Sequence, residues 1–247
     1  MLKDSKYYSK ILLFGEYGII KDSMGLSIPY NDYNGTFIFS DKKTEFSAKS
    51  NASLNKFYQH LLSLENTAKL PCKLNLKQFK TDIEKGIFFD SSIPQGFGVG
   101  SSGALVAAVY DKYCENKISA STKVTNKNIL QLKKVFGQLE SFFHGTSSGL
   151  DPLICYLNLP VLIKSKQELG TVGLPKSSQG KGAIFLMNTG QTGETQPLVQ
   201  HFLERCKEEG FRKSAIIKDG KRCSVHELSV LRRDWNAGKA EVKKLVK

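Results

Sequence analysis

The sequence predicts an α/β fold (α+β), because strand-like and helix-like segments follow one another along its 247 residues. In the strand-like segments apolar and polar residues partly alternate, whereas in the helix-like segments apolar residues recur every three to four positions. The length is sufficient for a large buried core and allows one or two domains. The sequence contains no internal repeats or low-complexity tracts.

The N-terminal part of the chain carries most of the strand patterns. We expect strands at Lys10–Ile20, Gly35–Ser40 and Thr44–Ala48, where apolar and polar residues partly alternate. Lys56–Leu64 has the apolar spacing of a helix, and Ile87–Ser91 returns to a strand pattern. This order supports the mixed fold.

Two helices are predicted in the middle of the chain. The first covers Ser102–Asn116 and follows a glycine-rich segment directly. Thr125 is placed to cap the second, because its hydroxyl can accept a hydrogen bond from a free N–H group of the first turn. The apolar positions of this second helix recur at helical spacing, at Ile129, Leu130, Leu132, Val135, Phe136 and Leu139. Leu159–Ile163 then has the pattern of a strand.

The C-terminal part alternates again between strand and helix patterns. A strand is predicted at Ala183–Asn188, after a loop rich in Gly, Ser and Lys, and a helix at Glu194–Glu209. Ala215–Arg222 has the pattern of a hairpin that turns at Asp219-Gly220. Val225–Lys247 is predicted to be an amphipathic helix.

The most informative segment is Pro94–Ala104, in which four glycines and two serines precede an apolar helical pattern. Glycines let a backbone approach a bulky anion, and a helix start offers free N–H groups with a positive dipole end. A phosphate chain fits such a loop. The alternative is a glycine-rich turn that caps an ordinary helix. The predicted phosphate-binding residues are Pro94, Gly96, Gly98, Gly100, Ser101, Ser102, Gly103 and Ala104. The spacing matches neither the P-loop nor the dinucleotide-binding fingerprint.

Two further segments accompany this loop. Lys10–Ile20 is an apolar run interrupted by Gly-Glu-Tyr, and Glu140–Pro152 leads from a helical pattern into a run of small residues. Together the three segments resemble the GHMP kinase family over about residues 8–165. The opening segment resembles K-x-I-L-F-G-E-H, the loop resembles P-x-G-x-G-L-G-S-S-A, and the third segment resembles E-x-x-x-H-G-x-P-S-G-x-D.

Phosphoryl transfer from ATP to an alcohol needs Mg²⁺ on the phosphates, a cation for developing charge and a group that takes the hydroxyl proton. Asp151 suits the proton acceptor, and Lys10 suits the cation beside it. Glu140 and Ser102 offer oxygen ligands for Mg²⁺. The resemblance implies the same four roles. Each residue taken singly also has a purely structural interpretation. Lys10 could be a solvated residue at a strand end, Glu140 an exposed helix residue, and Asp151 a turn residue before Pro152.

Within the family the segments are most similar to those of mevalonate kinases, which implies ATP-dependent phosphorylation of mevalonate in isoprenoid precursor synthesis. Glu16, Tyr17 and Ser148 are then expected to contact the substrate. The Gly-Glu-Tyr form looks like that of phosphomevalonate kinases, which are the alternative together with other GHMP kinases. His144 lies in the third segment, and we expect a hydrogen-bonded structural role for it rather than one as base or ligand.

The resemblance also implies two domains. An S5-like ATP-binding domain is expected over residues 1–165, and an incomplete ferredoxin-like domain over residues 166–247. Nothing after residue 190 resembles the third glycine-rich motif of the family, K-x-x-G-x-G-x-G-G. All five arginines lie beyond residue 204, so we expect an atypical tail from about residue 205. A catalytically impaired remnant that still binds nucleotide is therefore a second hypothesis.

Composition restricts the partners and the compartment. The net charge of +13 reflects 36 lysines and arginines against 23 acidic residues; the lysines are dispersed and no nucleic-acid motif occurs, so no specific nucleic acid is expected. No apolar run approaches a membrane span, and the N-terminus lacks the apolar segment of a signal peptide. The five cysteines are widely spaced, which suggests neither a disulfide framework nor a zinc site and favours the cytoplasm. The expected partner is a small-molecule substrate, with a homodimer left open.

Overall fold

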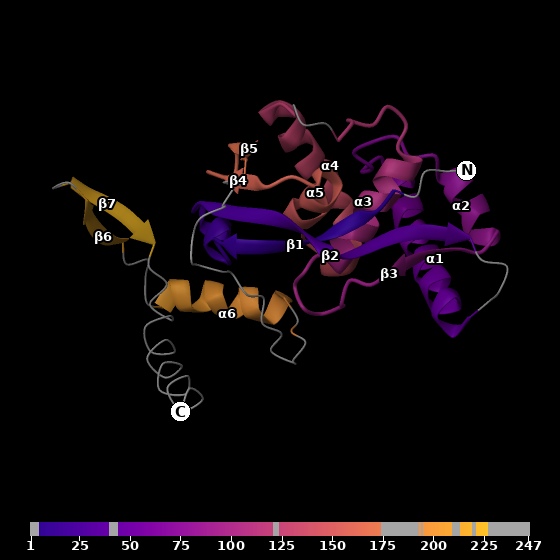
Figure 1. Ribbon diagram of the computed structural model, residues 1–247, viewed down its shortest axis with the longest axis horizontal. Coiled ribbons are helices and arrows are strands. Elements are labelled where there is room, and N and C mark those ends of the chain that lie inside the picture. The colour runs from indigo at the N-terminus through magenta and orange to yellow at the C-terminus, as the bar shows by residue number, and fades with distance from the viewer. Residues whose placement is uncertain are drawn as a thin grey trace. The chain divides into compact units, whose positions relative to one another are not determined.

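The computed structural model describes residues 5–39, 44–120, 124–173, 193, 195–208, 213–218 and 221–226 (Figure 1). The chain forms two compact units, residues 1–196 and 197–247. Helices are combined with antiparallel strands, so the predicted mixed fold is confirmed in its α+β form. The predicted domain boundary near residue 165 stays a prediction.

A five-stranded antiparallel sheet organises the first unit. Its long strand β2 (Gly25–Phe39) pairs with β1 (Tyr7–Phe14), with β3 (Ile87–Ser91) and with β4 (Val161–Ile163). A further strand, β5 (Leu169–Thr171), continues the sheet on β4. Because β2 forms hydrogen bonds with three other strands, segments that are far apart in the sequence lie in one sheet.

Helices pack on this sheet. The described helices of the first unit before residue 195 are η1 (Gly18–Lys21, 3₁₀), α1 (Glu45–Asn66), α2 (Leu76–Glu84), α3 (Ser101–Tyr113), α4 (Asn126–His144) and α5 (Leu150–Leu157). In Figure 1, α3, α4 and α5 lie together beside the β1–β2 pair. Helices α3 and α5 contact each other and β1, whereas α1 and α2 contact β3. Each of these described helices is too short or too polar to cross a membrane.

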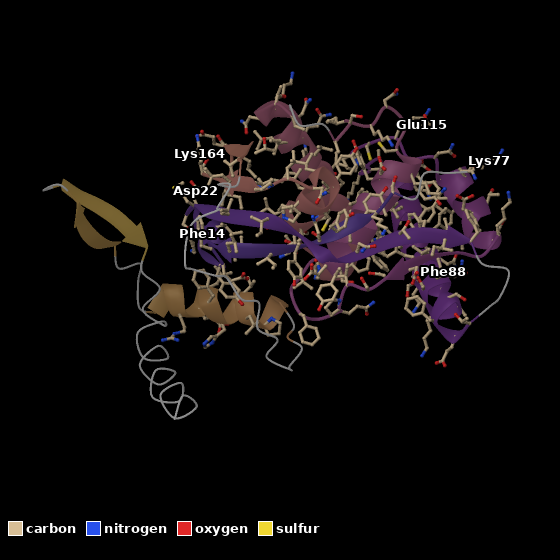
Figure 2. The ribbon with its side chains drawn as sticks, in the orientation of Figure 1. Phe14, Asp22, Lys77, Phe88, Glu115 and Lys164 are labelled. Carbon is tan, nitrogen blue, oxygen red and sulfur yellow. The ribbon has the colours of Figure 1, made fainter. Side chains whose placement is uncertain are left out.

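The side chains between the helices and the sheet form one apolar core. Phe57 of α1, Phe79 of α2 and Phe136 of α4 are fully buried in it. The ring of Tyr110 packs edge-on against Phe136 and Tyr156, with centroid separations of 5.0 and 5.3 Å. Figure 2 shows how densely side chains fill the space between the strands and the helices of this unit. This packing fixes the positions of α3, α4 and α5, which carry the site described below.

The prediction of a strand at Thr44–Ala48 is wrong, because these residues begin α1. Thr44 caps the helix: its Oγ1 accepts a hydrogen bond from Ser47 N at 3.0 Å, and Ser47 Oγ accepts one from Thr44 N at 2.9 Å. This reciprocal capping box satisfies two otherwise free donors. Local capping therefore outweighs the alternating pattern.

The predicted strand Lys10–Ile20 is too long. Strand β1 ends at Phe14, and Ile19 and Ile20 belong to η1. The backbone N–H of Ile19 donates to Gly15 O at 3.1 Å, which turns the chain after β1. The strand predicted at Gly35–Ser40 is the second part of the much longer β2.

Besides the 3₁₀ helix η1, two α-helices were not predicted, α2 and α5. Helix α2 is short, and Asn75 caps it by accepting a hydrogen bond from Gln78 N at 2.9 Å. Helix α5 contains Pro152, which the sequence analysis placed in a loop. Pro152 is the third residue of α5, where a missing N–H costs no intrahelical hydrogen bond.

Other predicted elements are confirmed. Lys56–Leu64 lies within α1, Ile87–Ser91 is β3, and the helix after the glycine-rich loop is α3. Thr125 caps α4, and its Oγ1 accepts a hydrogen bond from Asn128 N at 3.3 Å. The predicted strand Leu159–Ile163 contains β4.

The C-terminal predictions are confirmed where the chain is described. Helix α6 (Thr195–Glu208) matches the predicted helix, and β6 (Lys213–Lys218) pairs with β7 (Lys221–His226) as the predicted hairpin. The helix predicted from Val225 is wrong for Val225 and His226, which pair in β7 because the hairpin continues through them. The predicted strand at 183–188 and the remainder of the predicted helix, 227–247, lie outside the described residues.

Candidate active site

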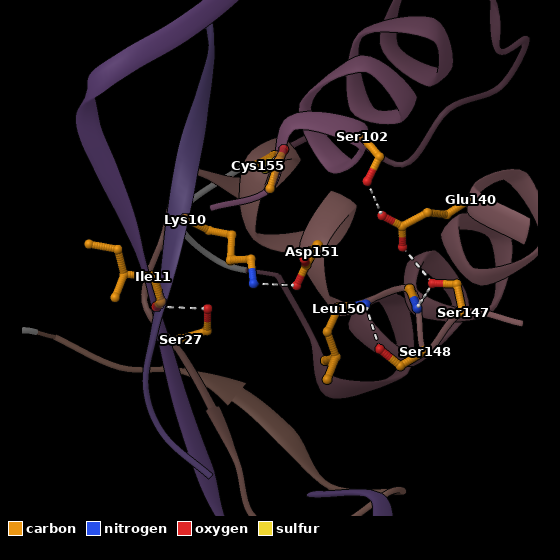
Figure 3. Close-up of polar contacts among 12 residues, drawn as sticks. Lys10, Ile11, Ser27, Ser102, Glu140, Ser147, Ser148, Leu150, Asp151 and Cys155 are labelled. Atoms are coloured by element: carbon orange, nitrogen blue, oxygen red, sulfur yellow. Dashed lines mark hydrogen bonds and ion pairs between the residues drawn. The ribbon is translucent and has the colours of Figure 1, made fainter. Parts of the chain in front are cut away.

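Lys10 lies on β1 with its side chain buried against the start of α5. Its Nζ is 2.9 Å from Oδ1 of Asp151, the second residue of α5 (Figure 3). The backbone N–H of Lys10 donates to Val99 O at 3.0 Å, which ties β1 to the glycine-rich loop before α3. Lys10, from the first of the three segments that the sequence singled out, therefore contacts both of the others.

Two glycines make this close approach possible. Gly100 precedes α3 with a φ of +86°, and a Cβ there would lie 2.9 Å from Cγ of Lys10. Gly103 lies in the first turn of α3, and a Cβ there would lie 2.8 Å from the carbonyl carbon of Asp151. The absence of side chains at both positions lets the loop reach Lys10 and lets α3 pack directly on α5.

Glu140 lies near the end of α4 and turns its carboxylate inward. Ser102 Oγ donates to Glu140 Oε1 at 3.1 Å, and Ser147 Oγ donates to Oε2 (Figure 3). The residue is only 3% exposed, so these hydroxyls replace water around the carboxylate. Nε2 of His144 lies 3.1 Å from Ser102 Oγ. The start of α3 and the end of α4 are thereby joined through oxygen atoms.

The charges of the site influence one another. Burial alone would lower the pKa of Lys10, but the charge of Asp151 and the hydrogen bond to it raise that pKa above its usual value. The pKa of Glu140 is raised to about 7, chiefly by burial and then by the nearby charge of Asp151. The hydrogen bonds from the two serines and the charge of Lys10 lower it and only partly offset the rise. Two carboxylates thus share one ammonium group. A further cation would be stabilised there.

Glu16, predicted to contact a substrate, lies in the turn after β1, and the charges of Lys10 and Asp151 affect its pKa. Burial raises its pKa, the charge of Lys10 opposes this shift, and the charge of Asp151 adds to it. Tyr17 follows with a φ of 57°, and burial and then the charge of Glu16 raise its pKa. Ser148 lies in the loop between α4 and α5, where its Oγ accepts a hydrogen bond from Leu150 N at 3.4 Å. This hydrogen bond is local to the segment that joins α4 to α5.

The glycine-rich loop leads into the start of α3. The N–H groups of Ser101, Ser102 and Gly103 belong to the first turn of α3 and have no acceptor within the helix, whereas Ala104 N donates to Gly100 O at 2.9 Å. Pro94, Gly96 and Gly98 form the preceding turn, in which both glycines have a positive φ. A negatively charged group at this helix start would meet free donors and the positive dipole end.

The donor set suits a hard divalent cation. Ser102 and Glu140 supply hydroxyl and carboxylate oxygens, which are the ligands that Mg²⁺ prefers. Within the described ranges, no group of three or more His, Cys, Asp or Glu side chains is placed to hold a metal. A Mg²⁺ bound here would therefore depend on oxygens from a ligand and from water, as it does on phosphates.

Two residues of the site, Ser147 and Cys155, were not singled out by the sequence analysis. Ser147 orients Glu140 and also accepts a hydrogen bond from Gly149 N at 3.0 Å. Cys155 Sγ donates to Gly100 O at 3.7 Å and thereby supports the loop from α5. Ser147 lies within the third segment, which was a usable signal. No sequence signal marked Cys155, because its contact with the loop depends on the position of α5, a helix that was not predicted. His144 keeps the hydrogen-bonded role expected for it.

Residues 55–158 match the family described as GHMP kinases N terminal domain. Solved structures similar to this chain include that of the mevalonate kinase of L. major in complex with R-mevalonate, with 14% sequence identity and a TM-score of 0.47. Others are the mevalonate kinases of Methanococcus jannaschii, with 14% identity and a TM-score of 0.40, and of methicillin-resistant Staphylococcus aureus MRSA252, with 18% and 0.37.

The three matches differ in extent. The match to the L. major protein covers 85% of this chain and 63% of that one. The other two each cover 68% of this chain, and they cover 55% of the Methanococcus jannaschii protein and 54% of the Staphylococcus aureus protein. The chain thus corresponds to less than two thirds of each of these proteins. No curated protein matches the sequence significantly.

Proposed function

We propose that this chain is a kinase of the GHMP family, whose N-terminal domain model matches residues 55–158, and that it transfers the γ-phosphoryl group of ATP to the hydroxyl of a small molecule. The single observation that carries the proposal is the 2.9 Å ion pair between Lys10 and Asp151, directly beside the start of α3. Phosphoryl transfer depends mainly on positioning and on charge stabilisation, and this arrangement offers both.

Asp151 is the proposed proton acceptor. Its carboxylate lies 2.9 Å from the ammonium of Lys10, and it is partly exposed, so a bound alcohol can reach it. As the oxygen of the alcohol bonds to phosphorus, its proton passes to Asp151, and the bond between phosphorus and the leaving oxygen of ADP breaks. Lys10 offsets the negative charge that develops on the transferred group.

Ser102 and Glu140 are the proposed ligands of Mg²⁺, and the free N–H groups at the start of α3 are the proposed donors to the phosphates. When bound, Mg²⁺ supplies positive charge to the phosphate oxygens. The raised pKa of Glu140 supports this role, because a buried carboxylate with a carboxylate neighbour gains most from a nearby cation.

Mevalonate is the proposed acceptor, which would place the chain in isoprenoid precursor synthesis in the cytoplasm. The likeness of residues 140–152 to the mevalonate kinase motif supports this choice. Glu16, Tyr17 and Ser148 are the proposed substrate contacts, and Glu16 is the one whose pKa responds to Lys10 and Asp151. Cys72, Cys114 and Cys155 are free thiols, as a reducing compartment favours.

A coupled assay of ADP release tests the proposal. Mevalonate, phosphomevalonate, galactose and homoserine are offered with Mg-ATP to the full chain and to D151N. Turnover with mevalonate that D151N loses supports the proposal. Turnover that is faster with phosphomevalonate, or with another acceptor, supports a different kinase of the family. ATP binding without turnover on any acceptor supports the second hypothesis, a nucleotide-binding remnant.

A further inference from the structure

A cavity of about 560 Å³ lies beside the candidate active site and shares Ser147 and Ser148 with it, between the end of α1, one side of α4 and the loop before α5. Four lysines line it, namely Lys69, Lys133, Lys134 and Lys166, and none of the described residues that line it is acidic. We call it the lysine cavity. Its volume is within the range of about 300–1,000 Å³ that is typical of small-molecule sites.

The lysine charges in this cavity are crowded. Lys133 is half-buried, and its Nζ donates to the backbone O of Lys166 at 3.3 Å. Burial lowers the pKa of Lys133, the charge of Lys166 lowers it further, and Asp22 opposes the shift. The carboxylate of Asp22 accepts a hydrogen bond from Lys166 N at 2.7 Å. A bound anion would relieve the repulsion between these ammonium groups.

The rest of the lining suits a phosphate ester. Thr146 and Ser148 supply hydroxyl groups that can donate to phosphate oxygens, and Gln138 supplies an amide. Leu64 and Leu130 supply apolar surface for the remainder of a ligand. A compact tetrahedral group with several oxygens uses four ammonium groups more fully than a single carboxylate does.

The lysine cavity shares a loop with the candidate active site. Ser147 lines the cavity and donates to Oε2 of Glu140, while the same loop leads into Asp151 at the start of α5. We propose that the lysine cavity binds a small molecule bearing phosphate groups, and that its occupancy holds the 145–149 loop in the arrangement in which Ser147 contacts Glu140. Phosphate binding in the lysine cavity does not require that the chain be a kinase.

Backbone amide NMR of the full chain, titrated with inorganic pyrophosphate at constant ionic strength, tests the proposal. We expect saturable shifts at Gly137, Gln138 and Thr146, and these are separable from shifts at Gly100 and Gly103 that binding at the start of α3 would cause. Shifts confined to the glycine-rich loop would overturn the proposal. Citrate, a carboxylate anion, should bind the lysine cavity more weakly, and equal or tighter binding would contradict the assignment to phosphates.

A pair of double variants separates the cavity from net charge. Lys69 and Lys134 are exposed, so K69A/K134A should fold normally, and it should weaken pyrophosphate binding at the cavity amides about tenfold. K77A/K85A removes the same charge from exposed positions on α2 and directly after it, and Figure 2 labels Lys77 there. This control should bind like the parent. Equal weakening in both variants would show that only net charge acts, and would overturn the site.

Discussion

The Nζ of Lys10 and the Oδ1 of Asp151 lie 2.9 Å apart, although Lys10 belongs to β1 and Asp151 to α5, about 140 residues further along the chain. If the two groups act as one unit, Lys10→Met should lower turnover at least about tenfold without abolishing ATP binding. The double variant with Asp151→Asn should then be little worse than the worse single variant. Steady-state kinetics of the four proteins measures this coupling, and fully additive effects would show that the two residues act separately.

Glu140 and Ser102 are expected to control the metal requirement. Glu140→Gln and Ser102→Ala should each raise the Mg²⁺ concentration that gives the half-maximal rate, because each removes or weakens an oxygen ligand. Ser101→Ala is the matched control, because Ser101 is next to Ser102 but its own hydroxyl is not hydrogen-bonded to Glu140. Rates measured across a Mg²⁺ titration decide the matter, and an unchanged requirement in Glu140→Gln would exclude that residue as a ligand.

The raised pKa of Glu140 predicts a pH-dependent stability of the metal-free protein. Folding raises this pKa to about 7, so the folded state binds the proton more tightly than the unfolded state does. The stabilisation is complete at pH values below the unfolded pKa of about 4.5 and is lost as the pH rises through about 7, a change on the order of 3 kcal/mol at most.

Denaturant unfolding without metal, at pH values from 5 to 8, measures this effect. The free energy of unfolding should fall with pH in the parent and change less in Glu140→Gln, whose amide cannot ionise. Identical pH slopes in the two proteins would contradict the assignment of the shift to Glu140.

Gly103 is expected to be intolerant of any side chain. A Cβ there would lie 2.8 Å from the carbonyl carbon of Asp151, so Gly103→Ala should push α3 away from α5, with a loss of about 1–3 kcal/mol in stability. Gly173→Ala is the control, because a Cβ at that position has no neighbour within 4 Å. Thermal unfolding of both variants tests this close approach, which a stable Gly103→Ala would refute.

The structure brings together residues that the sequence motifs marked, although it corrects several of the elements that carry them, and the roles of these residues stay proposals. Lys10, Ser102, Glu140 and Asp151 were identified because short motifs mark them, and the structure brings all four together. Helix α5 was missed because Pro152 and the small residues before it are typical of loops. A proline in a first turn is a positional detail that becomes visible only once the helix start is known.

Other errors have similar physical causes. Residues 44–48 alternate like a strand, but the capping box of Thr44 and Ser47 is a local interaction that fixes a helix start. The contact of Ser147 with Glu140 and that of Cys155 with the loop depend on tertiary packing between α4 and α5. Sequence spacing alone carries no information on such contacts.

Single-turnover transfer of label from γ-labelled ATP to mevalonate tests the central claim most directly. The parent chain should form labelled phosphomevalonate, and D151N should bind ATP as the parent does but transfer label about a hundredfold more slowly, because an amide cannot accept the proton. A parent chain that binds ATP and transfers no label to any alcohol, or a D151N variant as fast as the parent, would contradict the account.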